Sequence, residues 1–202
     1  MRRWRAGLAK FRDQEFAQFI LDGLEQGFRI GFQRGSALIQ AGRNMPCPDA
    51  SVVDEYLRRE MSLNRLIKLN KQEARSLGVH CSPMGMIPKK SKPGSWRLIV
   101  DLSAPEGRSV NDGIRRDMSS LSYMSVDLVA SRILKLGKGT ELAKVDIKQA
   151  YRLVPVHPAD RRRLGVQWQN TVYVDKCLPF GLRSAPILFS AVADAIQGMV
   201  QL

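Results

Sequence analysis

The sequence has few cysteines, few histidines and no long apolar run, and each shortage excludes a class of protein. Its three cysteines, Cys47, Cys81 and Cys177, are odd in number and far apart. They therefore form neither a disulfide framework nor the paired Cys-x-x-Cys ligands of a zinc site, and we expect reduced structural thiols. The two histidines, His80 and His157, have no partner at metal or general-base spacing, so we interpret both as structural.

The chain also lacks membrane and secretion signals. No stretch approaches the roughly 20 apolar residues that a membrane span needs. The Arg-rich start lacks the apolar core of a secretory signal, and Asp13 and Glu15 argue against a mitochondrial address. We therefore expect an intracellular protein, in the cytoplasm or nucleus, with no membrane partner.

Acidic residues are scarce relative to basic ones. Nineteen Asp and Glu stand against 32 Lys and Arg, which gives a formal net charge of +13. This excess favours a polyanionic partner such as nucleic acid, although a merely soluble basic surface is an alternative that charge alone leaves open. With 44% hydrophobic residues in 202, the chain can bury one sizeable core or two small lobes.

Helical periodicity dominates the first third of the chain. Apolar residues at spacings of three and four predict one amphipathic helix from Leu8 to about Phe32, weakened by Gly23 and Gly27. After a breaker region at residues 42–50, a second helix is predicted to begin with Ser51 as its N-cap. The inward residues of these helices are predicted to be Phe16, Phe19, Ile20, Leu24 and Phe28 in the first, and Val52, Tyr56, Leu63, Leu66 and Ile67 in the second.

Hairpins and helices alternate in the remainder. Residues 81–103 predict a hairpin with a basic tip, because Trp96, Leu98 and Val100 alternate with Arg97, Ile99 and Asp101. The pattern then predicts a helix from a Ser125 cap to Gly137, a strand that ends at Asp146, a second hairpin around Gln169-Asn170, and a final helix capped by Ser184. The apolar stripe of that final helix consists of Leu188, Ala191, Val192, Ala195, Ile196 and Met199.

Asp146 is the most informative single residue, with Tyr151 five positions after it. In a basic protein, a carboxylate at a strand end is where a polymerase holds magnesium against nucleotide phosphates, because hard cations take oxygen ligands. Taken alone, such an aspartate more often makes an Asx-turn. The surrounding sequence motifs are therefore needed to choose between a metal ligand and an Asx-turn.

Four segments provide that context, in the order PKKSKPGSWRLIVDLS, SVNDGI, AKVDIKQAYRLVPVHP and LPFGLRSAP. Together they resemble the fingers and palm of reverse transcriptases, most closely those of retrotransposons, over roughly residues 80 to 190; the shared order makes this more specific than any single motif. The resemblance implies an α+β fold: a right-hand polymerase fingers and palm fragment with β-hairpins, flanking helices and an incomplete palm sheet.

The same resemblance implies a division of the chain into five parts. They are an N-terminal helical extension and linker (1–50), the first part of the fingers (51–115), the first part of the palm (116–154), a second fingers hairpin (155–183) and a palm helix that stops before the second catalytic motif (184–202).

The resemblance also assigns metal and sugar roles. Asp146 corresponds to the first catalytic, metal-binding aspartate, with the backbone carbonyl of Ile147 as a further ligand, in a parent enzyme that uses two Mg²⁺ ions. Tyr151 corresponds to a gate that packs on a deoxyribose and leaves no room for a 2'-hydroxyl. An aromatic residue buried at a lobe junction is the alternative for Tyr151.

Four further residues correspond to nucleotide-binding positions. Lys90 and Arg97 correspond to the fingers residues that grip the triphosphate, with a solvated basic hairpin as the alternative. Phe180 stands where some viral relatives carry a glutamine; its ring can cover the sugar but cannot supply that hydrogen bond. Gly181 lets the backbone approach a base or sugar closely, and an ordinary helix-entry loop is the alternative for both. The run Arg161 to Arg163 could contact a template, and a solvated face is at least as good an interpretation.

These assignments lead to a functional expectation. The parent activity would be RNA-directed DNA synthesis from deoxynucleoside triphosphates on a primed RNA or DNA template. The family's aromatic-x-Asp-Asp motif does not occur before Leu202, so we expect the 202-residue chain alone to be inactive. The alternatives are a non-enzymatic basic nucleic-acid-binding remnant, and an unstable remnant in which Met199 and Val200 have nothing to pack against. The oligomeric state is left open.

Overall fold

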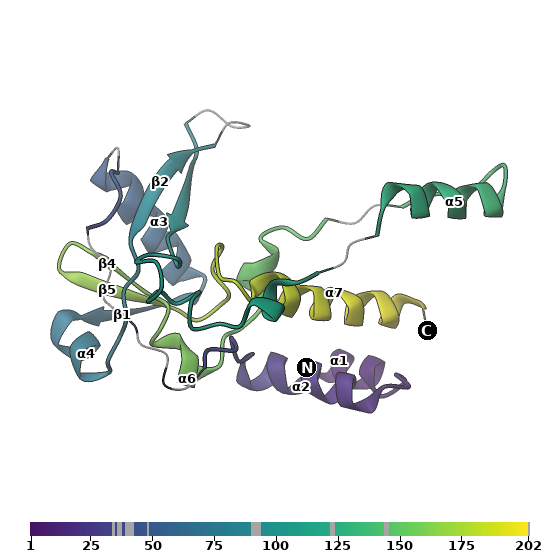
Figure 1. Cartoon of the computed structure of the whole chain (residues 1–202), viewed down its shortest axis with the longest axis horizontal. Coiled ribbons are helices and arrows are strands. Elements are labelled where there is room, and N and C mark those ends of the chain that lie inside the picture. Colours follow the sequence, from purple (N-terminus) through teal and green to yellow (C-terminus); the bar gives the residue numbers. More distant parts are fainter. Residues whose placement is uncertain are drawn as a thin grey trace.

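The computed structural model describes residues 1–33, 35, 38, 43–47, 49–89, 94–121, 124–143 and 146–201. They form a mixed α+β architecture with two small sheets, as expected (Figure 1). Within these ranges, no helix combines the length and apolar character needed to cross a bilayer. The helices are α1 (Arg2–Leu8), α2 (Gln14–Gln26), α3 (Ala50–Ser62), α4 (Lys71–Ser76), α5 (Val126–Leu136), α6 (Pro158–Arg161) and α7 (Ala185–Gln201), with 3-10 turns η1 (Arg116–Ser119) and η2 (Ala150–Leu153); the strands are β1 (Leu66–Asn70), β2 (Met84–Pro88), β3 (Trp96–Val100), β4 (Gly165–Trp168) and β5 (Thr171–Asp175).

Both predicted hairpins are confirmed. Strands β2 and β3 pair antiparallel from Met84 opposite Val100 to Pro88 opposite Trp96. Strands β4 and β5 pair through a turn at Gln169, whose φ is 53°. Strand β1 joins the other side of β5, so the larger sheet has the antiparallel order β1-β5-β4.

Helix α3 covers the apolar face of the β2–β3 hairpin. Val53 and Leu57 of α3 are buried in one cluster with Met84 and Met86 of β2 and Val166 of β4. Trp96, Leu98 and Val100 pack against this cluster, which confirms the alternation predicted for β3. Arg97, offset by one residue, therefore lies on the opposite face of the hairpin.

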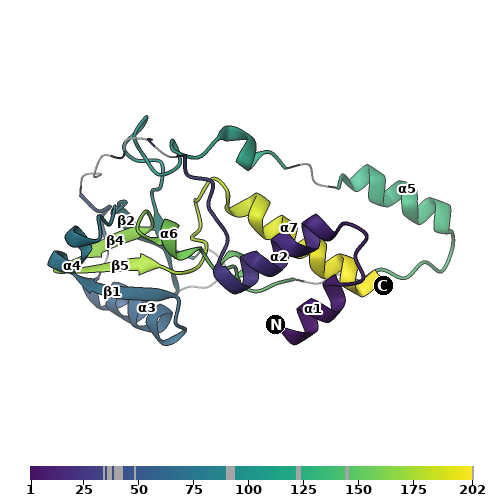
Figure 2. The same ribbon diagram turned by 90° about the horizontal axis from the view of Figure 1, so that it is seen from below.

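The main core lies where α1 and α2 pack against α7 (Figure 2). Leu8 and Ile20 are fully buried there, and the predicted apolar stripe of α7 is confirmed. Met199 contacts the first helix so closely that a Cβ on Gly7 would lie 2.4 Å from its sulfur. The expectation that Met199 would have nothing to pack against is therefore wrong, whereas Val200 is 82% exposed.

The single N-terminal helix from Leu8 to about Phe32 is a wrong prediction, because α1 ends at Leu8 and α2 covers only Gln14–Gln26 of that range. Asp13 caps α2 by accepting a hydrogen bond from the Phe16 amide at 2.8 Å. The helix ends at Gly27, whose φ of 93° is unfavourable for other residues. A Cβ on Gly23 would lie 2.1 Å from the ring of Phe28. That glycine therefore makes room for a buried aromatic residue, although it weakens the helix.

The second helix begins and ends earlier than predicted. Asp49, not Ser51, is the N-cap, and its carboxylate accepts from the Ser51 amide at 2.8 Å. The helix stops at Ser62, shortly before Asn64 adopts a φ of 56°. The predicted helical residues Leu66 and Ile67 belong instead to β1, because pairing with β5 overrides their helical spacing.

The predicted strand ending at Asp146 is not seen in the part of the chain that the structure describes. Residues 141–143 and 146–147 are irregular, and residues 144–145 lie outside the described ranges. A strand is stable only beside another strand. The described strands pair among themselves and none pairs with this segment.

Helix α5 has its predicted bounds and its predicted cap, since Ser125 accepts from the Leu128 amide at 3.2 Å. None of its residues is buried. Figures 1 and 2 show it on an extended arm, away from the other helices. Its apolar positions are therefore largely exposed, and none of them is buried against another described element.

We predict that the amides of α5 exchange with deuterium much faster than those of α7. An isolated helix of about this length is marginal in water, because most helix stability comes from packing. Hydrogen exchange followed by mass spectrometry should show α5 labelled within seconds while α7 stays protected. Equal protection of the two helices would contradict the arrangement.

Candidate functional site

Two segments far apart in the sequence meet at a pair of aromatic rings. The centroids of Tyr151, in η2, and Phe180 lie 5.2 Å apart at 48°. Phe189 of α7 also contacts Tyr151, edge-on at 5.8 Å. Tyr151 is half-buried and Phe180 is 50% exposed, so the pair presents an aromatic surface to solvent and is anchored from below.

Gly181 brings the same loop against β3. Its φ is +89°, and a Cβ there would lie 3.2 Å from the carbonyl oxygen of Val100. Gly181 was predicted to let the backbone approach a ligand closely. In the structure, it lets the loop pack against the end of β3, the strand that carries Arg97.

Asn111 holds this loop in place, and the sequence reading gave it no role. Its side chain is buried and donates to the carbonyl of Gly181 and to Ser103, both at 2.9 Å. The amide oxygen accepts from the backbone N–H of Arg183 at 2.8 Å. The Arg183 guanidinium in turn donates to the carbonyl of Ile114 at 2.7 Å. The only sequence signal was the SVNDGI motif itself, whose polar asparagine is buried because it bonds two loops.

Ser184 precedes α7 as predicted, but the predicted cap is not formed. Its side chain is fully buried, and its hydroxyl has no hydrogen-bond partner among the described residues. The backbone carbonyl of Ser184 accepts from the Leu188 amide at 3.1 Å instead.

Arg97 is exposed on the face of β3 that points away from α3. Its guanidinium is thus accessible to a ligand beside the hairpin. Lys90, its predicted companion, lies outside the described residues.

Asp146 is exposed and Ile147 is half-buried, a few residues before Tyr151. The described residues contain no cluster of three His, Cys, Asp or Glu side chains that could hold a metal ion. Mg²⁺ is commonly bound by one or two carboxylates together with water and substrate phosphates. Asp146 therefore fits a magnesium ion that is shared with a phosphate-bearing ligand, and does not fit a closed protein site.

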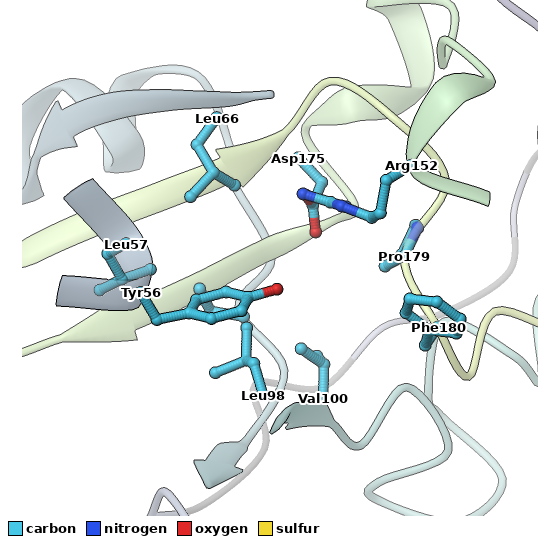
Figure 3. A pocket seen from close by; sticks show the side chains of 10 residues that line it. Tyr56, Leu57, Leu66, Leu98, Val100, Arg152, Asp175, Pro179 and Phe180 are labelled. Carbon is cyan, nitrogen blue, oxygen red and sulfur yellow. The ribbon is translucent and has the colours of Figure 1, made fainter. Parts of the chain in front are cut away.

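A buried charge cluster is formed by Glu60, Arg65, Arg152 and Asp175. Figure 3 shows two of its members, Arg152 and Asp175, beside the small pocket that Phe180 also lines. Arg152 donates from Nε and Nη2 to one carboxylate oxygen of Glu60, at 3.1 and 2.9 Å. Its Nη1 lies 2.5 Å from Asp175, in an ionic contact that lacks hydrogen-bond direction. Arg65 reaches the other oxygen of Glu60 at 3.4 Å. Two guanidiniums thus balance two carboxylates.

Burial and charge act in opposite directions on these groups. Burial alone would lower the pKa of Arg152, but Asp175 and Glu60 outweigh it and raise the pKa. Burial raises the pKa of Asp175, and Arg152 opposes the rise. Beside the cluster is a cavity of about 20 Å³, lined by Tyr56 and Phe180 among others, with room for one water molecule. Burial, followed by the charge of Glu60, raises the pKa of Tyr56 to about 12.

The arginine run is largely used inside the protein. Arg161 donates to the carbonyl of Val156 at 2.8 Å. Arg163 pairs with the buried Asp160 at 3.3 Å and lies 4.3 Å from the ring centre of Phe32. Arg162 is exposed. A template contact by all three arginines is therefore not supported.

The structural interpretation of the histidines and cysteines agrees with the fold. His157 caps α6 by accepting from the Ala159 amide at 3.2 Å. His80 is buried, which lowers its pKa. The three cysteines are thiols rather than disulfides, and burial raises the pKa of Cys81 to about 11.

Comparison with known proteins defines the class. The family described as "Reverse transcriptase (RNA-dependent DNA polymerase)" matches residues 87–202, more than half of the sequence. The chain belongs to this family.

Individual relatives agree with this assignment. The Transposon Tf2-3 polyprotein of Schizosaccharomyces pombe is 25% identical over 123 residues, which are 61% of this chain and 8% of the relative. The Tf2-7 polyprotein is 25% identical over 126 residues, 62% of this chain and 9% of the relative. The chain thus spans less than a tenth of these curated relatives.

Solved structures share the fold. The native Prototype Foamy Virus protease-reverse transcriptase has a TM-score of 0.56 at 17% identity, over 97% of this chain and 26% of that one. A foamy viral protease-reverse transcriptase in complex with double-stranded DNA has a TM-score of 0.57 at 16% identity, over 96% and 34%. The α+β fingers and palm fragment expected from the sequence is confirmed at the level of fold. The boundaries of its five parts stay a prediction.

We predict that Asn111→Leu lowers the free energy of unfolding by about 1–3 kcal/mol, because the part-buried hydrogen bonds to the Gly181 carbonyl and the Arg183 amide would be lost. Urea denaturation measures the loss. Asn44→Leu is a matched control, since the exposed Asn44 also bonds two backbone groups, Gln167 O at 2.7 Å and Met84 N at 3.2 Å. Equal losses in the two variants would contradict the role given to Asn111.

Proposed function

We propose that the chain forms the fingers and first part of the palm of a retroelement reverse transcriptase whose parent enzyme makes DNA from deoxynucleoside triphosphates on a primed RNA or DNA template. One observation carries this proposal. The aromatic contact between Tyr151 and Phe180, joined through Gly181 to the end of β3, brings three of the four sequence motifs to one place. Asn111 adds the fourth.

The site suits a nucleotide with its sugar on the aromatic surface. The exposed half of Phe180 and the edge of Tyr151 offer an apolar support for a deoxyribose, and the Tyr151 ring would exclude a 2'-hydroxyl. The accessible Arg97 guanidinium supplies a planar fork for phosphate oxygens, with Lys90 as a second cation.

Magnesium enters this proposal through Asp146. Its exposed carboxylate and the Ile147 carbonyl would hold the ion jointly with the phosphates of the nucleotide. Two such ions would serve the parent enzyme. Magnesium binding by the chain should accordingly depend on the nucleotide.

Nucleic acid is the proposed partner. The net charge of +13 favours a polyanion. Two structural relatives are described as complexes with double-stranded DNA and with an RNA/DNA hybrid. A primed template of this kind is therefore the ligand with which to test the chain.

We predict that Arg97→Gln weakens Mg·dGTP binding to the chain on an RNA template with a DNA primer by about tenfold, because a charge-assisted phosphate contact is lost. Fluorescence titration measures the affinity. Arg132→Gln, on the exposed arm helix α5, removes the same charge and should change binding little.

Asp146→Asn should abolish the magnesium dependence of dGTP binding, whereas Asp194→Asn, at an exposed position of α7, should not.

The same titrations separate the proposal from a non-enzymatic binding protein. Salt-dependent binding of the primed template that is indifferent to Asp146, to magnesium and to dGTP would favour the binding protein. Weak binding by both Arg97→Gln and Arg132→Gln would show that only total charge matters.

We further predict that the purified 202-residue chain does not extend a primer. Phosphoryl transfer with two metal ions needs several carboxylates, and no group of three metal-ligating side chains occurs in the described ranges. A radiolabelled primer should remain unextended in Mg²⁺ with all four dNTPs. Magnesium-dependent extension that disappears in Asp146→Ala would overturn this prediction.

A further inference from the structure

The turn that carries Tyr151 begins in an unusual backbone conformation. Gln149 has φ 56° and ψ 41°, the left-handed region that glycine favours. The Arg152 amide donates to the Gln149 carbonyl at 2.8 Å, which closes the turn. We call residues 149–152 the gate turn. A non-glycine residue stays in this region only where its surroundings hold it there.

Side chains at both ends of the gate turn are held by the buried charge cluster. At the first end, Arg65 donates from Nη1 to the Gln149 side-chain oxygen at 2.7 Å. At the last end, Arg152 is buried between Glu60 and Asp175. Tyr151 lies between the two anchors. The contacts of Gln149 and Arg152 with the charge cluster thus fix the direction of the Tyr151 ring without any ligand.

The cluster also reaches the hairpin that carries Arg97. Glu60 is on α3, and the same buried face of α3, one and two turns earlier, packs through Leu57 and Val53 on β2. A single rigid helix therefore lies between the gate turn and the hairpin. Arg65 is the link on which this connection depends, since it contacts both Glu60 and Gln149.

We propose that Arg65 and Gln149 are positioning residues that set the ring of Tyr151, and hence the discrimination between deoxyribose and ribose, by fixing the gate turn. The discrimination between the sugars rests on the proposed function, whereas the fixing of the gate turn is independent of that function. Neither residue touches the nucleotide site directly; each acts through the backbone of the turn.

The first test is hydrogen exchange of the gate turn in Gln149→Gly. Glycine relieves the left-handed backbone but removes the acceptor of Arg65, so we expect residues 147–154 to exchange roughly tenfold faster. Gln169→Gly is the matched control, because Gln169 also has a positive φ, 53°, in a hairpin turn that lacks this contact. Gln149→Glu keeps an oxygen for Arg65 and should retain the slow exchange.

The second test compares the affinities of dGTP and GTP on the primed template with Mg²⁺. We expect the unsubstituted chain, Gln149→Glu and Gln169→Gly to prefer dGTP, and Gln149→Gly to lose about tenfold of that preference. A merely structural role would lower the melting temperature without changing the ratio.

The outcomes separate the two proposals. Unchanged exchange in Gln149→Gly, or equally faster exchange at the gate turn in Gln169→Gly, would overturn the positioning role. Faster exchange with an unchanged preference for dGTP would overturn the link to sugar discrimination. Faster exchange in a chain that never prefers dGTP would support the fixing of the turn and overturn the function assigned to Tyr151.

Discussion

The placement of Arg152 between Glu60 and Asp175 is the constraint on which the rest of the structure depends. These groups are almost completely removed from water, which costs free energy that only close opposite charges offset. Arg65 completes the balance, so none of the four groups can move independently of the others. Helix α3, the end of β5 and the gate turn each carry one of these groups, so their positions depend on one another.

The candidate nucleotide site next to this cluster is built from residues that each contribute one or two contacts. Tyr151 and Phe180 provide an aromatic surface, Gly181 brings it to the end of β3, and Asn111 ties the loop down. Polymerase chemistry depends mainly on positioning and charge rather than on reactive side chains. An aromatic surface held by its neighbours, on a loop docked against the strand that carries the exposed Arg97, is consistent with such a role even though the sheets around it are small.

Local patterns in the sequence predicted the elements whose ends and apolar face are set by neighbouring residues. The β4–β5 hairpin follows from Gln169-Asn170, α5 from the Ser125 cap, and α7 from its apolar stripe. The predictions failed where distant segments decide. Pairing with β5 makes a strand of Leu66 to Asn70, and no described strand pairs with the residues around Asp146. Asn111 and the charge cluster were invisible because their partners lie 70 and 92 residues away.

The contact of α1 and α2 with α7 has a consequence for how the protein forms. During synthesis α1 and α2 emerge well before α7, which contributes to the surface that buries Leu8 and Ile20. The described strands and the cluster that α3 covers, in contrast, lie between Cys47 and Asp175. Contacts between sequence-distant segments close slowly. We therefore expect the middle of the chain to fold before α1 and α2 bury their apolar residues.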